Sequence, residues 1–377
     1  MMKKIIILGS TGSIGVQTVE VIRRYPDLFR VEGLACCSNV GLLNKQIAEF
    51  RPKYVSLADK TKIGDLLLNG SKLVDNIELM AEIPADITVN AVVGIGGLKA
   101  SLITLRQNGV LALANKESMV TGGELINADR KKYCGKILPV DSEHSAIFQC
   151  LHYEKPDREV NKLILTASGG AFRDYTIEEL EDVKAKDALR HPNWSMGQKV
   201  TIDCATMMNK GLEVLEAMYL YGLPVDKIDV VVHKQSIVHS MVEFVDGAIL
   251  AQLSYPTMLI PIQLALTYPE RLKSGIAYLD FSKISELNFS KPDFRKFPVL
   301  KIALDTAKAG GIMPIVMNGC NEILVDLFLK DKIKYKDIAY YLEMVLDDFD
   351  NTRVESVEQI FDVDKLSRQK TIELLTR

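Results

Sequence analysis

The chain has little cysteine, a single tryptophan and no excess of positive charge. Its six cysteines among 377 residues include no CxxC pair and no regular spacing, so free thiols in a cytoplasmic protein are favoured over a disulfide framework. Lys+Arg 46 against Asp+Glu 49 gives a net charge of −3, which argues against a nucleic-acid-binding protein. No apolar run approaches the roughly 18 residues of a membrane span, and the N-terminal run is too short for a signal peptide.

The remaining composition is that of a globular protein, with 47% hydrophobic and 25% charged residues. A prior of about 150 residues per domain predicts two to three domains. As far as residue 141, short β-rich runs alternate with helix-like stretches, which predicts an α/β domain with a Rossmann-like parallel sheet covered on both faces. The expected strands of this domain, residues 1–141, are Lys4–Leu8, Val31–Cys36, Tyr54–Leu57, Ile87–Val92, Val110–Ala114 and Ile137–Val140.

The rest of the chain changes character twice. Residues 142–267 contain strand-like runs with alternating apolar side chains, which predict an α+β domain with antiparallel pairing. Within it, a long segment from Ala167 to Val200 is typical of a functional or mobile loop. Residues 268–298 lack periodicity and are interpreted as a linker, whereas residues 299–377 show only helical periodicity, which predicts a helical bundle. The expected strands are Lys162–Thr166, Ile228–Val232, Ser236–Phe244 and Ala248–Leu253.

A glycine-rich turn follows the first expected strand. The run Gly9-Ser10-Thr11-Gly12-Ser13-Ile14-Gly15 is a variant of the dinucleotide-binding fingerprint and precedes an amphipathic stretch. Glycine lets the backbone approach a pyrophosphate, and a helix N-terminus offers free N–H donors. A tight turn without a ligand is the alternative. The second strand ends in Cys36-Cys37-Ser38-Asn39, without the carboxylate that usually binds the ribose of NAD, which favours NADP.

Carboxylates follow the sixth expected strand. Asp141 and Glu143 leave its end at i and i+2, so both can turn toward one hard cation, which prefers oxygen ligands. Glu213 could complete a three-carboxylate site, because Asn209 lies at i−4 on the same helix face, with Lys210 beside it. For each acid taken alone, a helix cap or a solvated helix face is the alternative.

Further polar groups suit a small anionic ligand. Lys116 follows a strand at the carboxyl edge of the sheet, where ligands bind, and a surface lysine is the alternative. Ser168 and the two glycines after it offer a hydroxyl and backbone amides to an oxyanion or phosphate. His191 and Trp194 lie in the long loop, where the tryptophan is either a lid over a ligand or an anchor of the loop.

Seven segments carry these features in order along the chain: GSTGSIG at 9–15, ANKES at 114–118, PVDSEHSAIFQ at 139–149, SGGAFR at 168–173, HPNWSMG at 191–197, DCATMMNKGLE at 203–213 and HKQSIVHSM at 233–241. Together they resemble the 1-deoxy-D-xylulose 5-phosphate reductoisomerase family of the non-mevalonate isoprenoid pathway. The resemblance implies an NADPH-binding N-terminal domain, a catalytic and dimerisation domain with a mobile loop, and a C-terminal helical bundle. It also implies a homodimer that requires Mg²⁺, Mn²⁺ or Co²⁺.

The implied reaction has two stages. A metal-assisted retro-aldol and aldol rearrangement of 1-deoxy-D-xylulose 5-phosphate is followed by reduction with NADPH to 2-C-methyl-D-erythritol 4-phosphate. Lys116 would stabilise an oxyanion or shuttle a proton. A simple NAD(P)-dependent dehydrogenase, which should turn over in the presence of a chelator, is one alternative. A non-catalytic nucleotide-sensing protein, which should bind nucleotide without turnover, is the other.

The resemblance also implies roles residue by residue. The implied metal ligands are Asp141, Glu143 and Glu213, and the implied catalytic residues are these three and Lys116. The implied substrate contacts are Lys116, Ser142, Glu143, Ser168, His191, Trp194 as the lid, Cys204, Asn209, Lys210 and Glu213. The implied cofactor contacts are Gly9, Thr11, Gly12, Ser13, Ile14, Cys37, Ser38, Asn39, Asn115, Glu117 and Gly197.

Two positions depart from the family pattern. Cys204 stands where many members have serine in the phosphate pocket, and a thiol is the weaker hydrogen-bond donor. Ser38 stands where many members have lysine. The expected 2′-phosphate site therefore lacks a cation, and a weaker preference for NADPH over NADH is predicted.

Overall fold

The computed structural model describes residues 2–151, 156–190, 192–194 and 196–376. The chain divides into two compact units, each made of three separate stretches. The first unit consists of Met1–Ser118, Glu124–Ser145 and Met258–Ile276, and the second consists of Met119–Gly123, Ala146–Thr257 and Ala277–Arg377.

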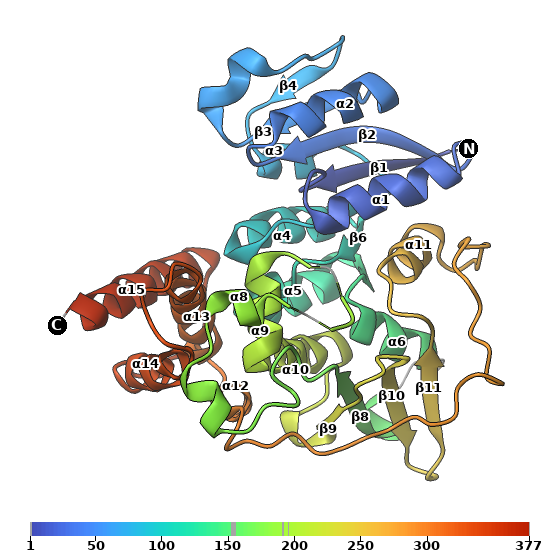
Figure 1. The fold of residues 1–377 in the computed structure, drawn as a ribbon. Coiled ribbons are helices and arrows are strands. Elements are labelled where there is room, and N and C mark those ends of the chain that lie inside the picture. The colour runs from blue at the N-terminus through green and yellow to red at the C-terminus, as the bar shows by residue number, and fades with distance from the viewer. Residues whose placement is uncertain (1, 152–155, 191, 195, 377) are drawn as a thin grey trace. The chain divides into compact units, whose positions relative to one another are not determined.

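A parallel sheet of seven strands, in the order β4-β3-β2-β1-β5-β6-β7, forms the centre of the first unit (Figure 1). Its strands are β1 (Lys3–Leu8), β2 (Phe29–Cys36), β3 (Tyr54–Leu57), β4 (Lys72–Val74), β5 (Ile87–Asn90), β6 (Val110–Leu113) and β7 (Lys136–Pro139). All but β4 lie within two residues of a predicted strand, and the predicted α/β class is confirmed. The sequence missed β4 because this edge strand has three residues and little burial, so no apolar pattern marks it.

Helices connect these strands. They are α1 (Ser13–Arg24), α2 (Val40–Phe50), η1 (Lys60–Asp65), α3 (Ile77–Ala81), η2 (Gly94–Gly97), α4 (Leu98–Arg106) and α5 (Lys116–Tyr133), with α6 (Ser142–Cys150) after the last strand. Residues 5–8 of β1 have no exposed surface. Because successive side chains of a strand point to opposite faces, both faces of the sheet are covered at its centre.

A segment from much later in the chain completes the first unit. Helix α11 (Leu259–Thr267) packs against α1, β6 and β7. Lys3 Nζ donates a hydrogen bond to the carbonyl oxygen of Leu266 at 3.1 Å, and Arg24 donates to the carbonyl oxygen of Ser274. The sequence placed this segment in the domain at 142–267 and the linker at 268–298. By packing it belongs to the first unit, because periodicity shows that a helix has an apolar face but not which partner covers it.

A mixed sheet in the order β11-β10-β8-β9 lies in the second unit. Its strands are β8 (Val160–Ala167), β9 (Ile228–Val232), β10 (Val238–Phe244) and β11 (Ile249–Leu253). As predicted, β10 is antiparallel to its neighbours, but β8 and β9 are parallel. The reason is the long crossover through α9 (Gln198–Thr206) and α10 (Met208–Tyr221), which parallel strands require. The shorter elements are α7 (Pro156–Glu159), η3 (Glu178–Glu181), α8 (Ala185–Ala188) and η4 (Val225–Lys227).

The C-terminal region is helical, as predicted, with α12 (Pro298–Ala309), α13 (Met313–Leu329), α14 (Tyr335–Asp347) and α15 (Val357–Thr376). These helices share one hydrophobic cluster with α9 and α10. A Cβ on Gly211 of α10 would lie 2.3 Å from the Cβ of Ala303 of α12, so the two helices are in close contact. Packing therefore does not separate residues 299–377 from α9 and α10 of the predicted domain at 142–267. The boundaries between the predicted functional domains stay predictions.

No helix in the described ranges is both long and apolar enough to span a membrane.

Candidate functional site

The glycine turn after β1 requires glycine at two of its positions. Gly9 has a φ of 87°, and a Cβ there would lie 2.5 Å from the backbone oxygen of Ala91. A Cβ on Gly15 would lie 2.2 Å from the carbonyl oxygen of Gly9. Gly12 precedes α1 without a side-chain cap, so the first N–H groups of the helix are available to a ligand. The turn thus has the backbone geometry of an anion site.

The other predicted contacts of this turn lie at its outer edge. Ser13 and Ile14 begin α1. The Thr11 hydroxyl lies 3.0 Å from Cys36 Sγ, so the turn is joined to the end of β2. Asn39, three residues further on, caps α2 by accepting a hydrogen bond from the Leu42 amide at 3.2 Å.

The end of β2 has a cation beside it that the sequence did not indicate. Lys62 of η1 donates from Nζ to the carbonyl oxygen of Ser38 at 3.3 Å. It also lies 3.4 Å from the carboxylate of Asp59, whose pKa is lowered from its usual value mainly by the Thr61 hydroxyl. Asp59 itself donates its amide to the carbonyl oxygen of Cys37, which ties η1 to this strand end. A cation from a neighbouring element therefore lies beside position 38.

Two further predicted cofactor contacts are buried at the carboxyl end of β6. Asn115 is 1% exposed and Glu117 is 6% exposed. The Asn115 side-chain amide donates to Glu117 Oε2 at 3.0 Å and to the carbonyl oxygen of Gly94 at 2.9 Å. A Cβ on Gly97 would lie 2.4 Å from Asn115 Oδ1, so the η2 turn and the start of α5 fit closely together.

Lys116 and Asp141 form an ion pair at the sheet edge. Lys116 begins α5 and Asp141 follows β7, and Lys116 Nζ lies 2.7 Å from Asp141 Oδ2. Both side chains are nearly buried, at 13% and 12% exposure. The Asp141 carbonyl accepts the Ser145 amide at 2.8 Å, so Asp141 is held at the start of α6. Ser142 Oγ donates to Glu143 Oε2 at 2.5 Å.

Helix α10 presents the third carboxylate. Glu213 is 1% exposed and accepts hydrogen bonds from the Asn209 amide and the Lys210 ammonium. The prediction that Asn209 and Glu213 share a helix face is therefore confirmed. Met207, at φ 62°, separates α9 from α10, so the residues that follow it begin a new helix. Asp203 of α9 has contacts typical of a structural residue. The Asn321 side-chain amide donates a hydrogen bond to Asp203 Oδ1 at 2.9 Å, and Lys199 Nζ lies 2.8 Å from Asp203 Oδ2.

The carboxylates of Asp141, Glu143 and Glu213 each place an oxygen within 4.8 Å of the others. Ile147 and Cys150, in the second half of α6, pack in one cluster with α10. Three carboxylate oxygens at this spacing suit a hard divalent cation.

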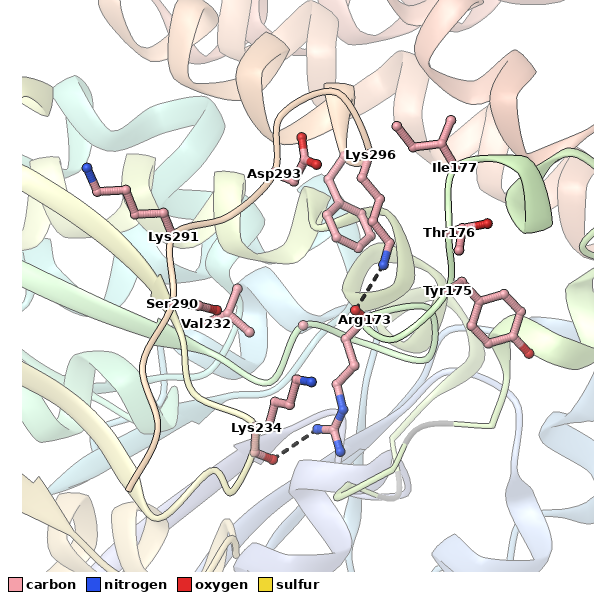
Figure 2. A pocket seen from close by; sticks show the side chains of 12 residues that line it. Arg173, Tyr175, Thr176, Ile177, Val232, Lys234, Ser290, Lys291, Asp293 and Lys296 are labelled. Carbon is pink, nitrogen blue, oxygen red and sulfur yellow. Dashed lines mark hydrogen bonds between the residues drawn. The ribbon is translucent and has the colours of Figure 1, made fainter. Parts of the chain in front are cut away.

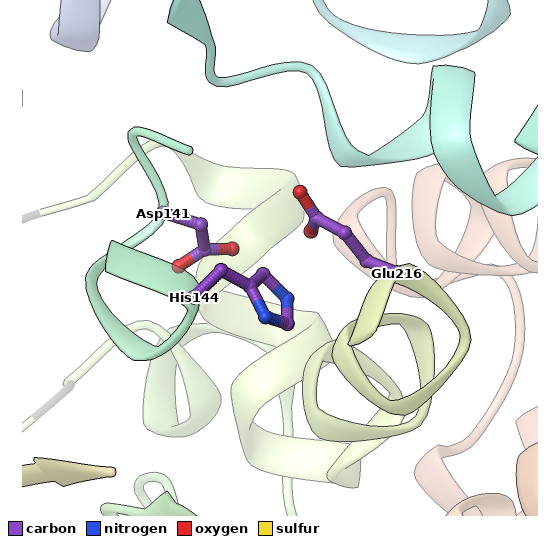
Figure 3. Close-up of side chains that lie close together, drawn as sticks. All are labelled: Asp141, His144 and Glu216. Atoms are coloured by element: carbon purple, nitrogen blue, oxygen red, sulfur yellow. The ribbon is translucent and has the colours of Figure 1, made fainter. Parts of the chain in front are cut away.

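A second group of side chains lies beside this one and was given no role by the sequence. Atoms of Asp141, His144 and Glu216 also lie within 4.8 Å of one another, and Figure 3 shows the three side chains pointing toward each other. His144 and Glu216 have no exposed surface. Only their spacing marked them in the sequence, since each lies three residues after an implied metal ligand.

The turn after β8 carries the predicted phosphate-binding hydroxyl. Ser168 Oγ accepts the Gly170 amide at 3.2 Å, and the φ angles of Gly169 and Gly170 are both positive. A Cβ on Gly170 would lie 2.2 Å from the carbonyl oxygen of Cys204, so the turn lies directly against α9. Arg173 Nη1 donates to the Ser168 carbonyl oxygen at 3.2 Å. The turn is thus fixed from both sides.

The long loop is tied to the start of β10. The Asn193 amide donates to Ser236 Oγ and to the Lys234 carbonyl oxygen, both at 2.7 Å. The Trp194 ring lies 6.1 Å from the His239 ring in an edge-on arrangement. Gly197 forms the N-cap of α9. The predicted substrate contact His191 lies outside the described residues.

Family models match three stretches of the chain. The 1-deoxy-D-xylulose 5-phosphate reductoisomerase model matches residues 5–123. Two C-terminal-domain models of the same enzyme match residues 137–221 and 253–370.

Relatives that match over nearly the whole chain carry the same name. The 1-deoxy-D-xylulose 5-phosphate reductoisomerase of Chloroherpeton thalassium is 48% identical over 376 residues, covering 98% of this chain and 97% of the relative. That of Thermoanaerobacter pseudethanolicus is 47% identical and covers 98% of each chain.

Solved structures agree over the full length. The Zymomonas mobilis enzyme in complex with NADPH has a TM-score of 0.93 at 38% identity, covering 100% of this chain and 99% of that one. A reductoisomerase in complex with NADPH, fosmidomycin and magnesium has a TM-score of 0.94 at 39% identity, with 100% and 98% coverage. On these matches, and with the glycine turn and the three grouped carboxylates in place, the chain belongs to the 1-deoxy-D-xylulose 5-phosphate reductoisomerase family.

Proposed function

We propose that this chain converts 1-deoxy-D-xylulose 5-phosphate to 2-C-methyl-D-erythritol 4-phosphate, by a carbon-skeleton rearrangement followed by NADPH reduction. The observation that carries the proposal is the group of three carboxylates, with Lys116 on one of them. A dehydrogenase that only transfers hydride has no need of such a group. The family members solved with NADPH and magnesium support the same assignment.

Asp141, Glu143 and Glu213 are the proposed ligands of a divalent cation, Mg²⁺, Mn²⁺ or Co²⁺. Their donor set fits, since oxygen atoms from three carboxylates lie within 4.8 Å of each other. When bound, the cation would act as a Lewis acid toward the oxygens of the sugar phosphate. Asn209 and Lys210 orient Glu213 by hydrogen bonds from one side.

Lys116 is the proposed group that acts on the reacting oxygens. Its ammonium is nearly buried and lies 2.7 Å from Asp141 Oδ2, so its charge is held in a fixed position. From there it can donate a hydrogen bond to an oxygen that becomes negative during the reaction. Ser142 and Glu143 are proposed to bind the substrate hydroxyls from the start of α6.

The substrate phosphate is proposed to bind between the turn after β8 and the α9–α10 junction. Ser168 offers a hydroxyl, and Asn209 and Lys210 offer an amide and an ammonium near the start of α10. Cys204 approaches the same turn through its backbone carbonyl. His191 is the remaining proposed contact. Trp194 is proposed as the lid over the bound substrate.

NADPH is proposed to bind in the first unit, with its pyrophosphate at the glycine turn and its 2′-phosphate at the end of β2. When bound, it would supply the hydride for the second stage. Gly9, Gly12 and the start of α1 fit a pyrophosphate, because the turn leaves helix N–H groups uncapped. Cys37, Ser38 and Asn39 line the strand end, and Lys62 supplies the cation there. The proposed nicotinamide-side contacts are Asn115, Glu117 and Gly197.

A homodimer in the cytoplasm is proposed for the assembly and its location. The location is supported by the cysteines, since all six are free thiols.

The test follows NADPH absorbance with 1-deoxy-D-xylulose 5-phosphate, with Mn²⁺ or Mg²⁺ and again in excess chelator. We expect metal-dependent NADPH loss, which falls by about a thousandfold in Asp141→Asn because the cation's several kcal/mol of stabilisation is lost. The matched control is Asp229→Asn, an exposed carboxylate on β9 paired with Lys162. Full metal-dependent turnover by Asp141→Asn would contradict the proposal. Turnover in chelator would favour a simple dehydrogenase, and nucleotide binding without turnover a sensing protein.

A further inference from the structure

A cavity of about 380 Å³ lies in the second unit, and none of the proposed substrate or metal contacts that the structure describes lines it. Its walls come from the turn after β8, the end of β9 and the segment that leads into α12 (Figure 2). Four cations line it: Arg173, Lys234, Lys291 and Lys296. Such a concentration of positive charge in a concave site suits an anion.

Two acidic groups at the cavity, Asp293 and Asp174, are already paired with basic side chains. Asp293 is the carboxylate that lines it, and Asp293 accepts hydrogen bonds from the amide and guanidinium of Arg295. Asp174, nearby, pairs with Lys234 and with Arg173. Across the described part of the chain, neither Lys291 nor Lys296 has a carboxylate within 4.0 Å. The cavity therefore keeps a net positive charge that a bound anion would neutralise.

The effect of burying positive charge in this cavity is clearest at Lys296. Its Nζ donates to the Arg173 carbonyl oxygen at 2.9 Å, which points the ammonium into the cavity wall (Figure 2). Burial lowers its pKa from the usual value, and this effect outweighs the nearby carboxylates of Asp174 and Asp293, which raise it. An anion beside this ammonium would oppose the effect of burial.

The basic groups are held by backbone contacts on both walls. Val232 and Ser290 exchange two backbone hydrogen bonds, of 2.8 and 3.0 Å, which fix the segment that carries Lys291 to the end of β9. Arg173 Nη1 donates to the carbonyl oxygens of Ser168 and Lys234 at 3.2 and 2.9 Å. The Arg173 guanidinium and the backbone segment that carries Lys291 are thus positioned before any ligand arrives, which lowers the entropy lost on binding.

We propose that this cavity binds a small soluble anion that carries a phosphate or diphosphate group, at a site separate from the substrate phosphate. The turn after β8 divides the two sites. Gly169 lines the cavity and contacts Val232 and Arg173, whereas Gly170 lies against Cys204 on the other side. Arg173 joins them, because the same guanidinium faces the cavity and holds the Ser168 carbonyl oxygen. Occupation of the cavity therefore affects the turn on which the proposed substrate contact lies.

Calorimetric titration with inorganic phosphate and, separately, inorganic diphosphate tests the proposal on full-length protein without metal or NADPH. We expect one class of binding site. Its Kd should rise by about tenfold in Lys291→Met and in Lys296→Met, because each variant removes a charge-assisted contact. Lys283→Met is the matched control, an exposed lysine of the same segment that does not line the cavity, and it should bind as wild type. Lys291 is itself exposed, so its variant reports binding even if Lys296→Met fails to fold.

Asn209→Ala distinguishes the cavity from the substrate site. We expect this variant to keep the class of site that Lys291→Met weakens. The proposal is overturned if Asn209→Ala abolishes all phosphate binding while Lys291→Met and Lys296→Met bind as wild type. It is also overturned if neither anion binds by about 10 mM, which corresponds to less than about 3 kcal/mol. Because binding is measured without turnover, a failure here is distinct from a failure of the proposed reaction.

Discussion

Replacing Lys62 by methionine removes the cation at the end of β2 while keeping most of the apolar stem. Lys62 Nζ donates to the Ser38 carbonyl oxygen at 3.3 Å, so its charge lies at the expected position of the NADPH 2′-phosphate. NADH has no phosphate there. The variant should therefore weaken NADPH binding and leave NADH binding unchanged.

The expected loss of NADPH affinity follows from the solvent exposure of the Lys62 side chain. The Lys62 side chain is 45% exposed, so its field acts through a largely aqueous medium, and Asp59 at 3.4 Å offsets part of its charge. Two unit charges about 4 Å apart in water interact by about 1 kcal/mol. The phosphate carries nearly two charges, which roughly compensates for Asp59. We expect a loss of about 1 kcal/mol, or roughly fivefold in Kd for NADPH.

The assay is nucleotide fluorescence titration with NADPH and NADH at low and high salt. The fivefold effect should shrink at high salt, because exposed charges are screened. Lys60→Met is the matched control, since Lys60 lies in the same short helix but donates to the Asp75 carbonyl oxygen. Equal weakening of both nucleotides, or of neither, would refute the assignment of Lys62 to the 2′-phosphate.

Two other predictions concern backbone space and thiol burial. Gly15→Ala places a Cβ 2.2 Å from a backbone oxygen, so the turn must open, and we expect loss of NADPH binding by fluorescence. Retained affinity in Gly15→Ala would contradict this. Burial raises the pKa of Cys320 to about 12, so its thiol stays protonated near neutral pH, whereas Cys37 and Cys134 are exposed. Mass spectrometry after brief alkylation at about pH 8 should find the two exposed thiols modified and Cys320 modified only after unfolding; rapid native modification of Cys320 would show the burial to be wrong.

The features predicted correctly from sequence are those set by neighbours along the chain. The apolar run of β1 and the glycine turn after it are local patterns, and the helical spacing of Asn209 and Glu213 is also local. Strand ends differ from the predictions by one or two residues, because hydrogen bonding with the adjacent strand sets them.

The features that were missed depend on tertiary neighbours. Lys62 lies 24 residues from Ser38 and reaches it only because β3 pairs with β2. Helix α11 packs against α1, which lies near the N-terminus and far from α11 in the sequence. His144 and Glu216 carry no motif of their own, so nothing in the sequence indicated that they would be grouped with Asp141. The carboxylate site was predicted because the residues and the family resemblance pointed to the same positions.

Helix α11 belongs to the first unit but is synthesised late, and this sets an order of events during translation. About 130 residues separate the end of the stretch at 124–145 from residue 276. At about 5–20 residues per second, translation of that interval takes roughly 7 to 26 s. Throughout it, the surfaces of α1, β6 and β7 that α11 covers remain without their partner. The nascent N-terminal sheet therefore spends seconds with an uncovered apolar face, and its final closure follows, rather than precedes, synthesis of most of the second unit.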